Sequence, residues 1–236
     1  MTDREDAGSH PTALITGASR GIGRAIAVRL AERYEIVAAA RSEAELDTLA
    51  AEIGERGGRC TTVTLDVANP RMVAEALADV DADVLVNNAG VGVLKPLLEL
   101  TPEEWHTMVD VNFNALYHVT RAVLPGMVRR GRGHVVVIGS IAGRSAFTGG
   151  TCYAATKHAV MGFAESLMLE VRDSGVKVSV VSPGSVRTNF SPEFAGKDWA
   201  LSPDDVAEAV LHVVDTPPAV LIHRLEVRTL TVPKKR

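Results

Sequence analysis

Aromatic residues are scarce in this 236-residue chain, and it has no excess of positive charge. Phe, Trp and Tyr together make up 4% of the residues, and the 25 Lys and Arg residues are outnumbered by 29 Asp and Glu. Proteins bind single-stranded nucleic acid with stacked aromatic side chains in a basic groove, and they bind duplexes with clusters of Lys and Arg. The composition therefore argues against a nucleic-acid partner.

The chain also has few cysteines and no long hydrophobic run. Cys60 and Cys152 cannot supply the disulfide framework of a small secreted domain, and no stretch reaches the ~18 apolar residues of a membrane span. Residues 1–11 are polar and lack the apolar core of a signal peptide, so we expect a short disordered leader there. These features predict a cytoplasmic protein with no membrane partner and no metal site.

What the chain does have is a regular alternation of short apolar runs with longer helical patterns. The runs predict strands at residues 12–16, 35–40, 59–65, 84–87, 134–138, 177–181 and 226–232, the last at a sheet edge. The patterns predict helices at 22–33, 43–56, 70–80, 101–130 with a bend or an end at Pro125, 152–173 and 203–215. This order predicts an α/β fold, a single-domain Rossmann-like doubly wound parallel sheet over residues 12–236 with helices on both faces.

A glycine-rich turn joins the first expected strand to the first expected helix. Residues 16–23 read TGASRGIG, and no Lys-Ser or Lys-Thr pair follows, which disfavours a nucleoside triphosphatase loop. Glycines in such a turn allow a sharp exit from the strand, a close approach to phosphates and tight packing of the helix. The turn therefore predicts a dinucleotide site that includes Gly17, Ser19, Arg20, Gly21, Ile22 and Gly23.

The end of the second expected strand indicates which dinucleotide this site prefers. An acidic residue at this position would bind the adenosine ribose hydroxyls, but the chain has Ala40 there and Arg41 next. A guanidinium at Arg41, with Arg20 close by in the glycine turn, can pair with a 2′-phosphate. We therefore expect NADP(H) to be preferred over NAD(H), the alternative being that Arg41 is a solvated arginine at a helix start.

Three further residues form a set that could reduce a carbonyl group. Ser140 follows an expected strand, and Tyr153 and Lys157 are four residues apart on one helix face. Taken singly, Ser140 could be a loop residue or helix cap, and the Tyr-Lys spacing could arise by chance. Together, a serine hydroxyl can position the carbonyl oxygen, and an ammonium can lower the pKa of a phenol from about 10 toward the working pH.

With Asn87–Gly90, Asn112 and Pro183-Gly184, these motifs resemble the short-chain dehydrogenase/reductase family over nearly the whole chain. The resemblance implies that Tyr153 is the acid/base and that Ser140 orients the substrate oxygen. It implies that Lys157 holds the nicotinamide ribose and lowers the Tyr153 pKa, and that Asn112 holds a water molecule in a proton relay. The catalytic residues it implies are thus Asn112, Ser140, Tyr153 and Lys157.

The same resemblance implies further cofactor contacts, a substrate loop and an assembly. The cofactor contacts are Asp66, Val67, Asn88, Ala89, Gly90, Pro183, Gly184, Val186 and Thr188, together with Tyr153 and Lys157. The substrate loop covers about residues 185–202, and the partner is a small carbonyl or alcohol substrate. A homodimer or homotetramer is expected, although residues 225–232 lack the glycine pair with which many relatives line a tetramer interface.

The sequence thus predicts an NADP(H)-dependent oxidoreductase that interconverts a ketone or aldehyde and an alcohol by hydride transfer. Two alternatives stay open. One is a 3-oxoacyl-carrier-protein reductase, in which Arg129, Arg130 and Arg132 could meet an acidic carrier protein. The other is a non-catalytic NADP-binding sensor or scaffold.

Overall fold

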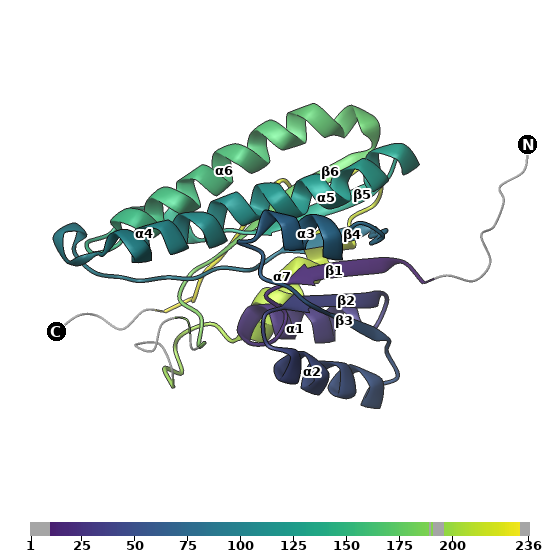
Figure 1. Cartoon of the computed structure of the whole chain (residues 1–236), viewed down its shortest axis with the longest axis horizontal. Coiled ribbons are helices and arrows are strands. Elements are labelled where there is room, and N and C mark those ends of the chain that lie inside the picture. Colours follow the sequence, from purple (N-terminus) through teal and green to yellow (C-terminus); the bar gives the residue numbers. More distant parts are fainter. Residues whose placement is uncertain (1–9, 189, 191–195, 232–236) are drawn as a thin grey trace, which may run out of the picture.

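The computed structural model describes residues 10–188, 190 and 196–231, so most of the expected leader lies outside the described residues (Figure 1). Within them, seven strands form one parallel sheet in the order β3-β2-β1-β4-β5-β6-β7. The strands are β1 Thr12–Thr16, β2 Glu35–Ala40, β3 Cys60–Thr64, β4 Val84–Asn87, β5 Gly133–Ile138, β6 Val176–Pro183 and β7 Arg224–Val227. The predicted doubly wound parallel sheet is confirmed.

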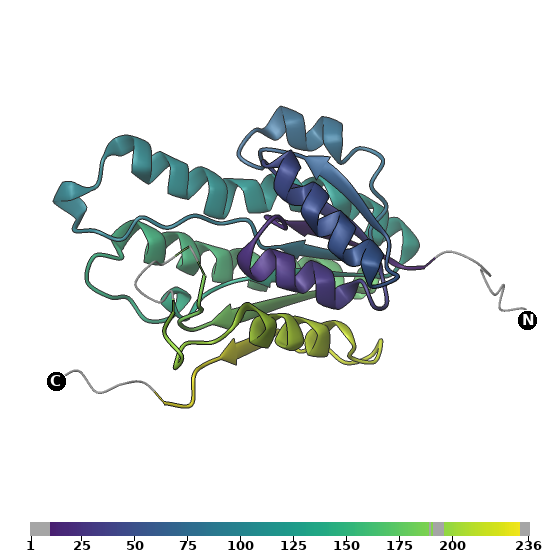
Figure 2. The same ribbon diagram turned by 90° about the horizontal axis from the view of Figure 1, so that it is seen from below.

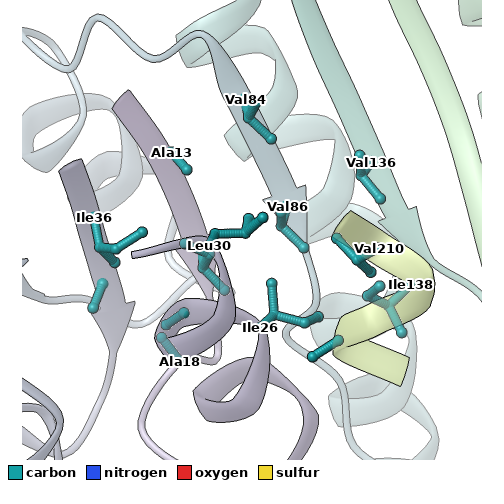
Figure 3. Packing of buried hydrophobic residues seen from close by; sticks show 14 of the residues in the cluster. Ala13, Ala18, Ile26, Leu30, Ile36, Val84, Val86, Val136, Ile138 and Val210 are labelled. Carbon is teal, nitrogen blue, oxygen red and sulfur yellow. The ribbon is translucent and has the colours of Figure 1, made fainter. Parts of the chain in front are cut away.

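Helices cover both faces of the sheet, as Figures 1 and 2 show. The main helices are α1 Gly21–Leu30, α2 Glu43–Glu55, α3 Pro70–Ala76, α4 Pro102–Val109, α5 Ala115–Arg130, α6 Thr151–Val171 and α7 Pro203–Val214. α1, α2 and α7 bury one face, where Ile26 and Val210 pack against strand residues such as Val86 (Figure 3). α3, α5 and α6 bury the other face. The two cores arise because successive strand side chains point to opposite faces.

The helical pattern at 101–130 ends at Arg130 as predicted, but it is divided by a π-helical turn, Asp110–Asn114, between α4 and α5. Of the two outcomes predicted for Pro125, a bend or an end, the end is excluded because α5 continues to Arg130, where Gly131 takes a left-handed conformation with φ of 66°. No helix within the described ranges combines the length and hydropathy that a membrane-spanning segment needs.

The strand order fixes where a ligand can bind. From β1 the chain moves outward to β2 and β3, and it then returns to place β4 on the other side of β1. At such a reversal, the loops after β1 and β4 diverge and leave a crevice at the carboxyl edge of the sheet. Within the described residues the last strand, β7, pairs only with β6, so the predicted edge position is confirmed. Its predicted bounds of 226–232 were wrong, because the strand covers residues 224–227 and the chain leaves the sheet at Arg228.

Candidate active site

A cleft of about 820 Å³ opens at the carboxyl edge of the sheet. It extends from the glycine turn after β1 to the loop after β6. Of the residues predicted from sequence, the cleft is lined by Gly17, Ser19, Arg20, Gly21, Ile22, Arg41, Asp66, Val67, Asn88, Ala89, Gly90, Ser140, Tyr153, Lys157, Pro183, Gly184, Val186 and Thr188. Gly23 and Asn112 do not line it.

The glycine turn brings the start of α1 to the cleft. Gly17 and Gly21 have φ values of 64° and 57°, which favour glycine over residues with a side chain. A Cβ on Gly23 would lie 2.2 Å from the carbonyl oxygen of Gly17 and 2.4 Å from Nδ2 of Asn88. Gly23 therefore acts by letting α1 pack against β1, as predicted, and not by contact with a ligand.

The first turn of α1 and two arginines make this end of the cleft suitable for phosphate groups. Arg20 is the N-cap of α1, and its side chain makes no capping hydrogen bond to the helix amides. Free N-terminal amides favour an anion. In the ranges that the structure describes, the exposed guanidinium groups of Arg20 and Arg41 form no salt bridge, and Ala40 occupies the place of the missing acid. These residues fit the pyrophosphate and 2′-phosphate of NADP.

Two asparagines at the end of β4 tie this strand to its neighbours. Nδ2 of Asn88 donates to the carbonyl oxygens of Thr16 and Gly17, at 3.0 and 3.2 Å. The backbone amides of Asn88 and Ala89 donate to Oγ1 of Thr16, both at 3.1 Å. Asn87 instead points into the core, where its Nδ2 donates to Oγ1 of Thr120 at 3.1 Å. The ends of β1 and β4 are thus fixed relative to each other.

Ser140, Tyr153 and Lys157 come together at the middle of the cleft. Ser140 follows β5, and the amide of Ala142 donates to its Oγ at 3.1 Å, which fixes the start of the turn Ile141–Gly143. The Ser140 side chain also lies close enough to Tyr153 to lower the pKa of its phenol. Lys157, one helical turn further along α6, is buried, and its Nζ donates to the carbonyl oxygen of Ile138 at 2.9 Å. The predicted set is therefore assembled.

The electrostatics of this set differ from the prediction in one respect. Burial raises the pKa of Tyr153, and the nearby Ser140 side chain lowers it only in part. Burial also lowers the pKa of Lys157 to about 8. The ammonium is directed to the carbonyl of Ile138 and lies 6.0 Å from the centre of the Tyr153 ring, so burial dominates the phenol's pKa.

Asn112 lies in the π-helical turn, and its side-chain amide makes three hydrogen bonds. Its Oδ1 accepts from the Val91 amide at 2.8 Å, and its Nδ2 donates to the Val91 carbonyl and to Oγ1 of Thr156. Beside it is a small cavity of about 10 Å³, which Asn112 and Lys157 both line. That volume is about what one water molecule requires. The geometry thus leaves room for a water between the two predicted relay residues.

The sequence reasoning missed the apolar walls beside Tyr153. Val91, Leu94, Ala146 and Phe147 line the cleft in loops that follow β4 and β5. Such loops have no hydrophobic periodicity, and only the rule that ligands bind at the carboxyl ends of strands could have indicated them. Thr156 was also missed, although its Oγ1 links Asn112 to the Tyr153 carbonyl.

The expected substrate loop is closed at its base. Val186 pairs with Leu201, and backbone hydrogen bonds join Ser185 and Arg187 to Leu201 at 2.9 and 2.8 Å. The ring of Phe190 lies 5.6 Å from that of Tyr153, so this loop residue borders the site as expected. Phe194, another apolar residue of the predicted loop, lies outside the described residues.

The three arginines considered as a carrier-protein patch lie far from the cleft. Arg129, Arg130 and Arg132 flank the end of α5 and precede β5, whereas Ser140 follows β5 at its other end. A six-residue strand spans about 20 Å. Arg130 and Arg132 also pair with Asp81 and Asp83.

Comparison with known proteins identifies the family. The family model for short chain dehydrogenases matches residues 11–198. The chain belongs to the short chain dehydrogenase family. As a member, it is an oxidoreductase that acts on CH–OH groups. The matched region includes every predicted site residue, whereas α7 and β7 lie beyond it.

Individual short chain dehydrogenases resemble the chain over most of its length. The NADP-dependent 3-hydroxy acid dehydrogenase of Salmonella typhi is 39% identical over 92% of this chain and 94% of the relative. Human retinol dehydrogenase 8 is 42% identical over 76% of this chain and 60% of the relative. Among solved structures, a closed serine dehydrogenase complexed with NADP+ has a TM-score of 0.87 at 34% identity, covering 95% of this chain and 99% of that one. An alcohol dehydrogenase from Thermococcus sibiricus has a TM-score of 0.89 at 35% identity over the same shares.

Proposed function

We propose that this protein is an NADP(H)-dependent oxidoreductase that interconverts a ketone or aldehyde and an alcohol. One observation carries the proposal. The pair Ser140 and Tyr153 faces the same cleft as the first turn of α1 and the side chains of Arg20 and Arg41. A proton donor therefore shares a cavity with a site suited to a phosphorylated dinucleotide.

The cofactor, when bound, supplies or accepts the hydride, and the side chains manage the oxygen and its proton. In the reducing direction, the Ser140 hydroxyl donates a hydrogen bond to the carbonyl oxygen and fixes its position. The Tyr153 hydroxyl then gives its proton to the oxygen as negative charge develops there. In the oxidising direction the phenolate takes that proton back.

Lys157 and Asn112 assist the proton transfer without contacting the substrate oxygen. The Lys157 ammonium lies 6.0 Å from the centre of the Tyr153 ring, and its positive charge would stabilise the phenolate that forms when Tyr153 gives up its proton. With a pKa near 8, Lys157 can also exchange a proton near neutral pH. We propose that a water in the cavity lined by Asn112 and Lys157 passes this proton toward solvent.

NADP(H) is the proposed cofactor because the adenosine end of the cleft is arranged for a 2′-phosphate. Two guanidinium groups, Arg20 and Arg41, lie where a carboxylate would otherwise bind the ribose hydroxyls. The similarity to an NADP-dependent dehydrogenase and to serine dehydrogenase with NADP+ supports the same choice.

Substitution of Tyr153 by Phe tests the acid/base role. Tyr153→Phe should lower kcat by at least about a thousandfold, because the proton donor is removed, while the Kd for NADPH changes by less than about threefold. Tyr117 on α5 is half-exposed and serves as the matched control, so Tyr117→Phe should retain the wild-type kcat. Near-normal turnover by Tyr153→Phe would contradict the mechanism, and a wild-type protein that binds NADPH but reduces no carbonyl would favour the sensor alternative.

A carrier-protein substrate is the weaker enzymatic alternative. The fold resembles a 3-oxoacyl-[acyl-carrier protein] reductase from Brucella melitensis, with a TM-score of 0.85 at 30% identity. However, the arginines that could meet an acidic carrier lie at the opposite edge of the sheet from Ser140. We therefore expect higher kcat/KM with small ketones than with an acetoacetyl thioester, and steady-state rates with both compare the two hypotheses.

Assembly and location are also proposals. We propose a homodimer or homotetramer, as the family resemblance implies. We also propose a cytoplasmic location, since Cys60 and Cys152 are free thiols and suit a reducing compartment. Sedimentation of the purified protein tests the assembly, and a monomer at micromolar concentration would contradict it.

A further inference from the structure

The part of the cleft that receives the reacting carbon is bordered by apolar side chains. Leu94 and Phe147 line it from the loops after β4 and β5, and the Phe190 ring lies 5.6 Å from the Tyr153 ring. Leu94, Phe147 and Phe190 are 40%, 43% and 39% exposed, so each presents a large hydrophobic surface to whatever enters. Bound apolar groups would cover this surface and be stabilised by it.

The positively charged side chains of the cleft either lie at the end away from Tyr153 or already donate a hydrogen bond to the protein. Arg20 and Arg41 line the end formed by the glycine turn and β2. Lys157 is the only Lys or Arg near Tyr153 among the described residues that line the cleft, and its ammonium is buried and donates to the Ile138 carbonyl.

Four other cations lie on segments near the cleft without lining it. Lys95 pairs with Glu104 at 2.6 Å and Arg187 lies 3.8 Å from Asp198, while Arg144 and Arg228 share Glu226. In the sequence, residues 189 and 191–195 contain one charged residue, Glu193, which is acidic. Among the described residues that line the cleft, no unpaired cation therefore faces a negatively charged substrate beside Tyr153.

We infer that the preferred substrates are ketones and secondary alcohols whose reacting carbon carries uncharged, apolar groups, and that hydroxy acids are disfavoured. This inference rests on the proposed function and narrows its substrate class. A carboxylate next to Leu94 and Phe147 would lose hydration without gaining an ion pair, which is costly. A neutral ester of the same acid avoids this cost and covers the apolar walls.

Oxidation of a matched acid and ester tests the inference. With NADP+ at pH 7.5, kcat/KM should be at least about tenfold higher for methyl 3-hydroxybutanoate than for 3-hydroxybutanoate. Equal or faster oxidation of the acid would overturn the substrate class while leaving the oxidoreductase proposal intact. If neither compound is oxidised and no ketone in a panel is reduced although NADPH binds, the proposed function and this inference both fail.

Introducing a cation into the apolar wall tests whether the lack of a cation there is what disfavours hydroxy acids. Leu94→Arg and Phe147→Arg place a guanidinium at side chains that are already partly exposed, so the fold should tolerate them. Each variant should raise the acid-to-ester ratio of kcat/KM by at least about tenfold. The uncharged controls Leu94→Gln and Phe147→Gln should change that ratio by less than about threefold. An unchanged ratio in both arginine variants, or an equal rise with glutamine, would contradict the inference.

Discussion

At the scale of single residues, Arg41 illustrates how one side chain can select a cofactor. It directly follows β2, whose last residue, Ala40, is almost completely buried. A carboxylate at that strand end would favour the ribose hydroxyls of NAD, whereas a guanidinium favours a phosphate. We therefore expect the choice between the two cofactors to depend on a residue that contributes little to packing.

Arg41→Gln should weaken NADPH binding without weakening NADH binding. Loss of a charge-assisted hydrogen bond to the 2′-phosphate costs about 1.5–3 kcal/mol, so the Kd for NADPH should rise by roughly 10- to 100-fold. Titration of cofactor fluorescence measures both constants. Arg121→Gln, at an exposed position of α5, is the control for loss of one positive charge. A parallel loss of NADH affinity would show that Arg41 acts on the fold or the pyrophosphate instead.

At the scale of secondary-structure elements, buried polar contacts hold neighbouring strands in place. Nε2 of His134 on β5 lies 2.8 Å from Oγ of Ser179 on β6, and that hydroxyl donates to the Ile222 carbonyl. Burial, with a smaller contribution from the charge of Lys177, lowers the His134 pKa to about 4. This histidine is neutral in the folded protein at every pH where the enzyme would work.

The His134 pKa predicts a specific loss of stability in acid. The unfolded chain binds a proton at this residue near pH 6.5, whereas the folded chain does so only near pH 4. Between these values the unfolded state holds more protons, so the free energy of unfolding falls by up to about 1.4 kcal/mol per pH unit as the pH drops. Urea unfolding of wild type and His134→Gln from pH 7 to pH 4.5 measures this slope. The variant's slope should be shallower, and identical slopes would contradict the assignment.

The turn that carries Ser140 depends on close contact with α6. A Cβ on Gly143 would lie 2.8 Å from the Lys157 carbonyl oxygen and 3.0 Å from Cγ of Met161. Gly143→Val should therefore push this turn away from α6, destabilise the protein by about 1–3 kcal/mol and lower kcat/KM by roughly 100-fold as Ser140 moves. Enzyme assays and urea unfolding measure the two effects.

Gly162 provides the matched control for the same helix. A Cβ there meets no atom within 4 Å, so Gly162→Ala should retain activity and stabilise α6 by about 0.5–1 kcal/mol. Unchanged activity in Gly143→Val would show that the turn can move without disturbing Ser140.

The elements themselves were largely predictable, whereas their irregularities were not. The buried strands were found because both of their faces are apolar, and six of the seven strands were placed to within two residues of the structure. The π-helical turn at Asp110–Asn114 escaped because its one extra residue hardly alters the hydrophobic spacing. α5 continues through Pro125 because the packing of the helix outweighs the tendency of proline to end a helix.

Within the site, the residues that belong to spaced motifs were predictable, and the apolar walls were not. Gly17 lies in a glycine-rich turn, Arg41 follows a strand end that lacks an acid, and Tyr153 lies one helical turn from a lysine. Leu94 and Phe147 are ordinary residues whose role comes only from the loops that bring them beside Tyr153. That Asn112 binds Val91, rather than a ligand directly, likewise depends on tertiary contacts.

At the scale of the whole molecule, the cleft joins two parts of the sheet. The glycine turn and Arg41 follow β1 and β2, while Ser140 follows β5 and the Pro183–Thr188 segment follows β6. A dinucleotide that contacts all of these is bound by the native fold and not by the unfolded chain. Ligand binding should therefore stabilise the entire domain.

NADPH should raise the thermal midpoint more than NADH at the same concentration. At 100 times its Kd, a ligand adds about 2.7 kcal/mol, which corresponds to roughly 5–10 °C for a chain of this length. Differential scanning calorimetry measures both shifts. Arg41→Gln should reduce the NADPH shift toward that of NADH, and Tyr117→Phe should not. Equal shifts in the wild type would contradict the cofactor preference.

The pairing of Val186 with Leu201 has a consequence for how such an enzyme can diversify. The chain leaves and re-enters the body of the protein at one fixed point, so residues between these anchors can be exchanged, lengthened or shortened without moving the chemistry-bearing helix α6. This segment can therefore change its contribution to substrate selectivity without displacing α6. A graft of the 189–200 segment from a relative should alter the preference among substrates, while the Kd for NADPH should stay close to that of the wild type.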